Sequence, residues 1–272
     1  MTILVTGGLG YIGSHTVVEL LNNNFEVVII DDLSNTEKFI LKNIEEITGK
    51  KPIFYPFDLK RKELLKQVFD AHKIEGCIHF AAYKAVGESQ EKPIDYYENN
   101  LFSLINLLQE MKERNISNFI FSSSCTVYGQ ADTMPIDENT PLKLPESSYG
   151  KTKQMGEEIL KDFATAHQKK VTLLRYFNPI GAHPSAKLGE LPIGIPNNLV
   201  PYVMQTAAGV REKLSVWGND YETEDGTAIR DYIYVVDLAK AHVKALQKLL
   251  KMSSDTQIDI YNLGTGKGSS VL

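Results

Sequence analysis

Apolar runs alternate with amphipathic segments along the chain as far as residue 175. Each run is short and rich in β-branched residues, which is typical of buried strands, and the segments between the runs have helical spacing. Strands that alternate with helices indicate βαβ units. We therefore expect an α/β fold with a doubly wound, Rossmann-like parallel sheet. The pattern predicts strands at 2–6, 26–30, 53–57, 76–80, 118–122 and 171–175, and helices at 12–22, 37–48, 61–72, 94–114 and 149–168.

Prolines become frequent after residue 178, and the regular alternation ends there. They divide this part of the chain into loops around a short predicted helix at 197–208. We interpret residues 178–272 as a smaller substrate-binding region that is interleaved with the sheet. Within it, apolar runs predict strands at 214–217, 232–236 and 258–261, a helix at 237–251, and the start of a further helix at the glycine-rich end, 264–272.

A glycine-rich turn follows the first predicted strand. Gly7, Gly10 and Gly13 lie between that strand and a predicted helix, which is the context that a dinucleotide-binding fingerprint requires. Glycines let the backbone approach a pyrophosphate, whose charge then lies at a helix N-terminus. A tight turn without a ligand does not need three glycines at this spacing. The turn therefore predicts a dinucleotide site.

Two acidic residues follow the second predicted strand. Asp31 ends that strand, about 20 residues past the glycines, where the ribose hydroxyls of a dinucleotide would lie. Asp32 comes next, and no basic residue appears before Lys38. An acidic side chain repels a 2′-phosphate, and no adjacent cation would receive one. This pattern favours NAD over NADP.

Tyr149 and Lys153 are four residues apart on one predicted helix, so they share a face. A phenol with a reference pKa of about 10 is a poor base near neutrality. A nearby ammonium group favours the phenolate and lowers that pKa. The pair therefore predicts a tyrosine that accepts a proton near neutral pH.

Polar residues follow four of the predicted strands. In open α/β sheets, ligands bind beyond the carboxyl ends of the strands, so these residues should meet at one edge. Any one of them has a structural explanation, such as a serine that caps the next helix, but together they outline one pocket. Asn99 does not belong to this set, because its spacing on the 94–114 helix predicts an exposed polar residue. The four segments are Asp58, Phe80–Lys84, Ser122–Ser124 and Arg175–Asn178.

Composition narrows the class of protein. The net charge is −5 and no basic stripe is present, which argues against a nucleic-acid partner. No apolar run is long enough to span a membrane, and the N-terminus starts a strand and not a signal peptide. Cys77 and Cys125 make no disulfide framework, and the six histidines show no metal-ligand spacing. We expect a cytoplasmic protein without a metal site.

Five long stretches carry a resemblance that covers essentially the whole chain. In these stretches, the sequence resembles the UDP-galactose (UDP-glucose) 4-epimerases of the extended short-chain dehydrogenase/reductase superfamily. The resemblance implies an NAD-dependent isomerase of galactose metabolism, which interconverts UDP-glucose and UDP-galactose through a 4-keto intermediate and transient NADH. It also implies an NAD-binding Rossmann domain at 1–177 and a UDP-sugar-binding region at 178–272. The stretches are 5–15, 79–89, 119–129, 174–184 and 218–232.

The resemblance assigns roles to three groups of residues. The catalytic set would be Ser124, Tyr149 and Lys153. NAD would contact Gly7, Gly10, Tyr11, Ile12, Gly13, Asp31, Asp32, Asn35, Thr36, Asp58, Leu59, Phe80, Ala81, Lys84, Asn99, Ser122, Tyr149, Lys153 and Phe177. The UDP-sugar would contact Ser124, Asn178, Asn198, Leu199, Trp217, Arg230 and Tyr232.

The chemistry of the last group agrees with these roles. Asn198 and Leu199 open a predicted helix, whose backbone N–H groups can meet phosphate. The guanidinium of Arg230 suits a diphosphate, and Trp217 could stack on uracil.

The resemblance also implies a mechanism. Tyr149, as phenolate, would take the proton of the sugar 4-hydroxyl, and Ser124 would hydrogen-bond the 4-oxygen. Lys153 would lower the pKa of Tyr149 and bind the nicotinamide ribose. Relatives form homodimers through the helices that correspond to 94–114 and 149–168.

The sequence departs from the family pattern in two places. Cys125 stands where close relatives often have Ala, and we expect it to be a small packing residue beside the site. Family members continue well beyond residue 272, so the resemblance implies a truncated chain that lacks a second diphosphate-binding Arg. The residue that sets the size of the hexose pocket would be missing too. The preference between hexose and N-acetylhexosamine therefore stays open.

Three alternatives compete with the epimerase. A nucleotide-sugar 4,6-dehydratase needs an Asp-Glu pair after Ser124, where this chain has Cys125 and Thr126. A nucleotide-sugar decarboxylase needs a group that holds a C6 carboxylate; no extra base is obvious, and this alternative stays open. An NAD-binding sensor would have no need of Ser124, Tyr149 and Lys153, although a folded NAD binder with weak turnover stays open.

Overall fold

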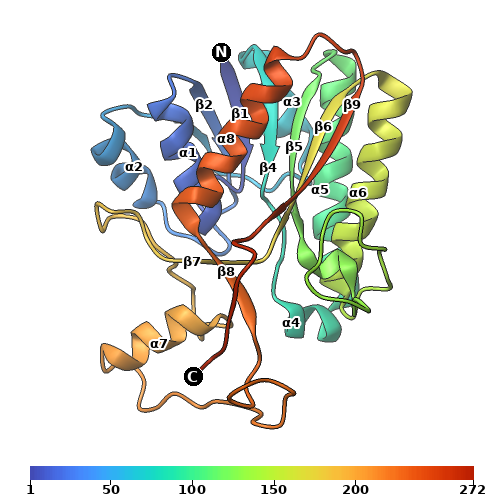
Figure 1. Cartoon of the computed structure of the whole chain (residues 1–272). Helices are drawn as coiled ribbons and strands as arrows, with labels where there is room; N and C mark the ends of the chain where they lie inside the picture. The colour runs from blue at the N-terminus through green and yellow to red at the C-terminus, as the bar shows by residue number, and fades with distance from the viewer.

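The computed structural model describes all 272 residues and contains a seven-stranded parallel sheet between two layers of helices (Figure 1). The strand order is β3-β2-β1-β4-β5-β6-β9, and every pairing within this sheet is parallel. This confirms the predicted Rossmann-like α/β class. The strands are β1 Thr2–Thr6, β2 Glu26–Ile30, β3 Ile53–Tyr55, β4 Ile74–His79, β5 Asn118–Ser124, β6 Lys170–Tyr176 and β9 Gln257–Leu263.

Each strand is buried on both faces, which explains its continuous apolar sequence. Successive side chains point to opposite faces, so Ile3 and Val5 of β1 pack on one side of the sheet and Leu4 on the other. Helices α1 Tyr11–Asn22, α2 Ile40–Thr48 and α8 Val235–Lys251 cover the first face. Helices α3 Lys62–Ala71, α5 Pro93–Glu113 and α6 Ser148–His167 cover the second.

A smaller layer lies beyond the carboxyl ends of the main strands (Figure 1). Its three-stranded sheet has the order β10-β8-β7, with β10 Gly268–Ser269 antiparallel and β7 Asn178–Ile180 parallel to β8 Arg230–Tyr234. Helix α7 Leu199–Ala207 lies next to it. The chain then returns to the main sheet through α8 and β9, so the predicted interleaving is present. The division at residue 177 into two functional domains stays a prediction.

Several elements differ from the expected ones, and the strand β7 at 178–180 was not among those expected. Residues 214–217 form no strand, because this apolar run has no partner strand and its side chains are exposed. The expected helix start at 264–272 is wrong, since β10 Gly268–Ser269 pairs there with β8. A short helix, α4 Val86–Glu91, was not predicted, and neither was the 3₁₀ turn η1 Cys125–Tyr128.

The topology places a ligand crevice between β1 and β4. The chain winds outward from β1 through β2 to β3 and then crosses back to β4, so the strand order reverses at this point. Loops from β1 and β4 therefore diverge and leave a space beyond the carboxyl ends. The glycine turn and the Phe80–Lys84 segment both lie at this crevice.

None of the helices is both long and apolar enough to cross a membrane.

A buried ion pair joins α6 to the sheet. Arg175 of β6 is 2% exposed and Glu157 of α6 is fully buried. The guanidinium donates to both carboxylate oxygens, from Nε at 2.9 Å and from NH2 at 2.6 Å. Ser123 of β5 donates to the same carboxylate at 2.5 Å, and Arg175 also donates to the Tyr128 hydroxyl at 2.8 Å. The pair thus joins α6 to β5, to β6 and to the turn that follows β5.

Arg175→Met should destabilise the protein strongly, because it leaves the Glu157 carboxylate buried without a counter-ion. We expect a loss of about 3–5 kcal/mol in the free energy of unfolding, measured by urea titration. Adding Glu157→Met should recover most of the loss, since no unpaired charge then remains. The control is Glu158→Gln on the same helix, which breaks an exposed pair with Lys161 and should cost less than about 1 kcal/mol. Equal losses for Arg175→Met and Glu158→Gln would contradict this prediction.

Candidate active site

The glycine turn has the shape that a pyrophosphate site needs. Gly10 is the N-cap of α1 and provides no side-chain cap, so the first N–H groups of the helix have no side-chain partner. A Cβ on Gly13 would lie 2.1 Å from the carbonyl oxygen of Gly7, and a Cβ on Gly7 would lie 2.7 Å from the backbone nitrogen of Ala81. Only glycine fits at both positions. The turn can therefore hold a phosphate on its backbone N–H groups.

Asp31 supports the glycine turn directly. Its carboxylate oxygens accept hydrogen bonds from the backbone N–H of Leu9 and of Leu33, each at 3.0 Å. Burial raises the pKa of Asp31, and these backbone hydrogen bonds act in the opposite direction. Thr36 adds a second link, because its hydroxyl donates to the Leu9 carbonyl at 2.7 Å. The predicted contacts of Asp31 and Thr36 with a ribose stay predictions, but both residues lie at the turn.

The loop after β4 is held in place by Asn100, a residue that was not identified as functional from the sequence. Asn100 accepts from the backbone N–H of Tyr83 at 2.8 Å and donates to its carbonyl at 3.1 Å. It also donates to the Thr152 hydroxyl of α6 at 2.9 Å. The signal was available, since Asn100 lies four residues before Leu104 in the buried stripe of α5. The expectation that Asn99 is exposed was wrong, because the fold buries it beside Asn100.

The other predicted cofactor contacts line the same edge. Phe80 donates its backbone N–H to the Thr6 carbonyl at 3.0 Å, so this loop is tied to β1. Phe177 begins the stretch after β6 and bonds to the Leu263 carbonyl at 3.1 Å. Asp58 follows β3, and its carboxylate accepts from the Lys60 backbone N–H at 2.8 Å. These residues and their neighbours Asp32, Asn35, Leu59, Ala81 and Lys84 follow four different strands, and Ser122 lies within β5 near its carboxyl end.

Ser124 and Tyr149 meet at the end of β5. Ser124 is the last residue of β5, and its Oγ caps the following turn by accepting from the Thr126 N–H at 3.2 Å. Tyr149 lies in the first turn of α6, which Ser147 caps by accepting from the Gly150 N–H at 3.1 Å. Ser124 lies close enough to the Tyr149 phenol to act on its pKa, which it lowers. The fold thus brings the two predicted residues together.

Lys153 lies one turn further along α6 and is 4% exposed. Its Nζ donates to the Ser122 carbonyl at 2.6 Å and lies 5.8 Å from the centre of the Tyr149 ring. Burial lowers the pKa of Lys153 to about 7. Burial also raises the pKa of Tyr149 to about 12, although the nearby Ser124 acts in the opposite direction. This is opposite to the lowered tyrosine pKa that we expected, because desolvation of the phenolate is the largest influence on it.

A second buried pair lies under the site. Tyr176 ends β6, and its hydroxyl donates to Nε2 of His242 at 2.5 Å. The other ring nitrogen of His242 donates to the Leu238 carbonyl at 2.8 Å, which fixes the tautomer. Burial lowers the pKa of His242 to about 4, so the ring stays neutral and keeps accepting from Tyr176. The pair joins α8 to the strand that carries Phe177.

Five of the predicted UDP contacts lie in the smaller layer. Asn178 of β7 faces Tyr232 of β8 across the ladder and donates to the Asp231 carbonyl at 3.2 Å. Arg230 is exposed and lies close enough to Cys125 to oppose the upward shift that burial causes in the pKa of that thiol. Asn198 is the N-cap of α7, and Leu199 is its first residue.

Trp217 is 86% exposed, so it does not pack in the core. Its contact with uracil stays a prediction.

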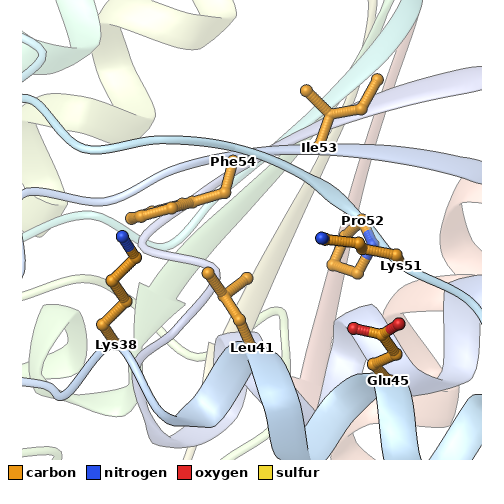
Figure 2. Close-up of a pocket in the computed structure, with 7 residues that line it drawn as sticks. All are labelled: Lys38, Leu41, Glu45, Lys51, Pro52, Ile53 and Phe54. Atoms are coloured by element: carbon orange, nitrogen blue, oxygen red, sulfur yellow. The ribbon is translucent and has the colours of Figure 1, made fainter.

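A hollow of about 460 Å³ lies away from these residues, between α2 and the edge strand β3 (Figure 2). It shares no residue with the predicted site. Its lining consists of Lys38, Leu41, Glu45, Lys51, Pro52, Ile53 and Phe54.

Comparison with protein families agrees with this geometry. Residues 3–264 match the family described as NAD dependent epimerase/dehydratase family, and the chain belongs to this family. It is 55% identical to the UDP-glucose 4-epimerase of Bacillus subtilis over its whole length, and it covers 79% of that protein.

Two solved structures have the same fold over the whole chain, each with a TM-score of 0.95. One is the UDP-glucose 4-epimerase of Bifidobacterium longum in complex with NAD⁺ and UDP, 47% identical to this chain. The other is the UDP-glucose 4-epimerase of Stenotrophomonas maltophila with bound NAD and formylated UDP-arabinopyranose, 45% identical. The chain covers 80% of each.

The burial of Lys153 should make the free energy of unfolding depend on pH. The folded protein keeps the Lys153 proton only up to about pH 7, whereas the reference value for lysine is 10.5. Between these values the unfolded chain binds more protons, so the wild type gains stability as the pH rises. Lys153→Met lacks this contribution. Urea titrations at about pH 7, 8 and 9 should show the difference between the two proteins changing by about 1 kcal/mol per pH unit. A difference that does not change with pH would show that Lys153 has an ordinary pKa.

Proposed function

We propose that this protein is an NAD-dependent UDP-glucose 4-epimerase, which interconverts UDP-glucose and UDP-galactose. The observation that carries the proposal is the assembly of Ser124, Tyr149 and Lys153 at the same edge of the sheet as the glycine turn. Only glycine fits at two positions of this turn, as a phosphate-binding backbone needs. The relatives support it, because they are named UDP-glucose 4-epimerase and are 55% and 53% identical in sequence to the whole of this chain. The reaction belongs to galactose metabolism.

Different residues of the chain have separate roles in the reaction. NAD, held by the glycine turn and the loop after β4, supplies the hydride acceptor and donor that oxidation and re-reduction at C4 require. Tyr149 accepts the proton of the sugar 4-hydroxyl and later returns it, so no proton is consumed. Ser124 hydrogen-bonds the 4-oxygen from the end of β5. Asn178, Asn198, Leu199, Trp217, Arg230 and Tyr232 hold the UDP moiety.

Burial decides how Tyr149 becomes a base. The phenolate is the form that desolvation penalises, so any positive charge brought into the pocket lowers the pKa of Tyr149 from its value of about 12. Lys153 is the cation that the chain itself provides, and its own pKa of about 7 lets it change charge near neutrality. A proton can therefore move between buried groups without a permanent charge in the pocket.

The dehydratase chemistry in the family name is less well supported. Expelling a 6-hydroxyl needs an acid beside Ser124, and the next two residues are Cys125 and Thr126. Burial raises the pKa of the Cys125 thiol, which makes it a weaker acid than usual. A 4-keto-6-deoxy product from UDP-glucose would favour the dehydratase, and carbon dioxide from UDP-glucuronate would favour the decarboxylase.

Tyr149→Phe should reduce epimerisation by about 10²–10⁴, the usual contribution of a general base, while the ring keeps its packing. Proton NMR of UDP-glucose incubated with the protein measures the appearance of UDP-galactose. Tyr221→Phe is the matched control, because Tyr221 is 52% exposed and lies outside the predicted catalytic set. If Tyr149→Phe kept more than about a tenth of the wild-type rate, Tyr149 would not be the main base.

We also propose that two copies of the chain pair through α5 and α6. The outer surface of these helices carries Phe102, Ile105 and Met155, which are 54%, 36% and 45% exposed. A hollow of about 490 Å³ lies beside them, lined by Leu101 and Ile159 among others. Apolar side chains gathered at one surface favour burial against a partner. The cytoplasmic location expected from composition stays a prediction.

Phe102→Glu should convert the dimer to monomer, because it places a charge in the buried centre of the proposed contact. Sedimentation velocity measures the change in mass. Phe39→Glu serves as control, since Phe39 is 49% exposed and lies in the stretch before α2, far from α5 in the sequence. A wild type that sediments as a monomer would overturn this proposal.

A further inference from the structure

Glu190 lies between the two halves of the site, and no role has been assigned to it above. Its side chain is only 11% exposed. Its Oε1 accepts a hydrogen bond from Nδ2 of Asn198 at 2.5 Å, and the same oxygen lies 3.8 Å from Nζ of Lys84. Lys84 ends the loop after β4, on the cofactor side, and Asn198 begins α7, on the UDP side. One carboxylate oxygen thus contacts a residue from each side.

The segment before Glu190 is fixed to the core. Leu188 is 2% exposed and packs with α1 and α8. The segment closes on itself through the hydrogen bond from the His183 N–H to the Leu188 carbonyl, at 2.8 Å. The Lys187 carbonyl accepts from Asn43 of α2 at 2.7 Å, and the Lys187 ammonium pairs with Glu46. Glu190 is therefore presented from a rigid base, as a positioning group requires.

The charge of Glu190 needs an explanation at this place. Its field reaches the first turn of α1, because it contributes to the raised pKa of Tyr11. A carboxylate this close to a helix N-terminus that is suited to phosphate opposes the binding of an anion. The cost is offset only if the carboxylate orders groups that the ligands need. Lys84 is 53% exposed and Asn198 is exposed, so both side chains would otherwise be free to rotate.

We propose that Glu190 is a positioning residue that holds Lys84 and Asn198 together and so couples the cofactor side of the site to the UDP side. The inference rests on the proposed function for the roles of those two residues. Through Asn198, Glu190 sets the orientation of the group at the start of α7. Through Lys84, it sets the position of the cation beside the cofactor. Because both contacts use one oxygen, the two groups are ordered as a unit.

Two substitutions separate the contacts. Glu190→Ala removes both, whereas Glu190→Gln keeps an oxygen that can accept from Asn198 and removes the charge that attracts Lys84. Glu46→Gln is the matched control, since it breaks the Lys187 pair on the same segment without touching either partner. The readouts are KM and kcat by NMR, UDP affinity by calorimetry, and the rate at which NAD is lost on dialysis, followed by absorbance.

Glu190→Ala should raise KM and the Kd for UDP by about tenfold or more, with kcat changed much less, and should speed the loss of NAD. Glu190→Gln should restore KM to within about threefold of the wild type and still lose NAD faster. In an Asn198→Ala background, Glu190→Ala should cause no further loss of UDP affinity, because the partner is already absent. Glu46→Gln should behave as the wild type.

Two results would overturn the inference. One is unchanged KM, UDP affinity and NAD retention in Glu190→Ala. The other is an equal change in Glu190→Ala and Glu46→Gln, which would show only a loosened segment. If the wild type itself formed no UDP-galactose, the proposed function would fail, and UDP affinity and NAD retention would still decide the role of Glu190.

Discussion

The position of helix α6, which carries Tyr149 and Lys153, depends on the buried Glu157–Arg175 pair. Two charges taken out of water are costly, and the cost is met only when both partners are present with good geometry. Here the carboxylate has the guanidinium and a serine hydroxyl, and the guanidinium also has the Tyr128 phenol. Tyr128 in turn donates to Asn262 of β9 at 2.7 Å. Since Glu157 is one turn after Lys153 on the same helix, a shift of α6 that moved Tyr149 would also disturb this network.

The main sheet could be predicted from the sequence because its signal is local. Parallel strands buried on both faces have continuous apolar runs, and each predicted run up to residue 175 is a strand. The region after residue 178 was harder, since its short strands depend on pairing between distant segments. The run at 214–217 looks like a strand but finds no partner, whereas Gly268 and Ser269 pair with β8 in spite of their composition. Tertiary contacts decided both cases.

The site divides in the same way. The glycine turn and the Tyr149–Lys153 spacing are local patterns, so the sequence could place them. Asn100, Glu157 and Glu190 act through contacts with residues at least 8 positions away, and of the three only Asn100, in the buried stripe of α5, has a local signal. Burial is also a property of the whole fold. For this reason the sequence predicted that Tyr149 and Lys153 share a face of one helix but not the direction in which the pKa of Tyr149 is shifted.

The packing of α8 on α1 has a consequence for the folding of the chain during its synthesis. Helix α8 packs on α1 and closes the core over the glycine turn, yet it ends at residue 251. Chains are synthesised at about 5–20 residues per second, so α1 waits roughly ten to fifty seconds for its partner to leave the ribosome. During that time its apolar side lies open while the neighbouring strands already exist. The nascent chain therefore exposes the apolar side of the helix that follows the glycine turn until α8 has been made.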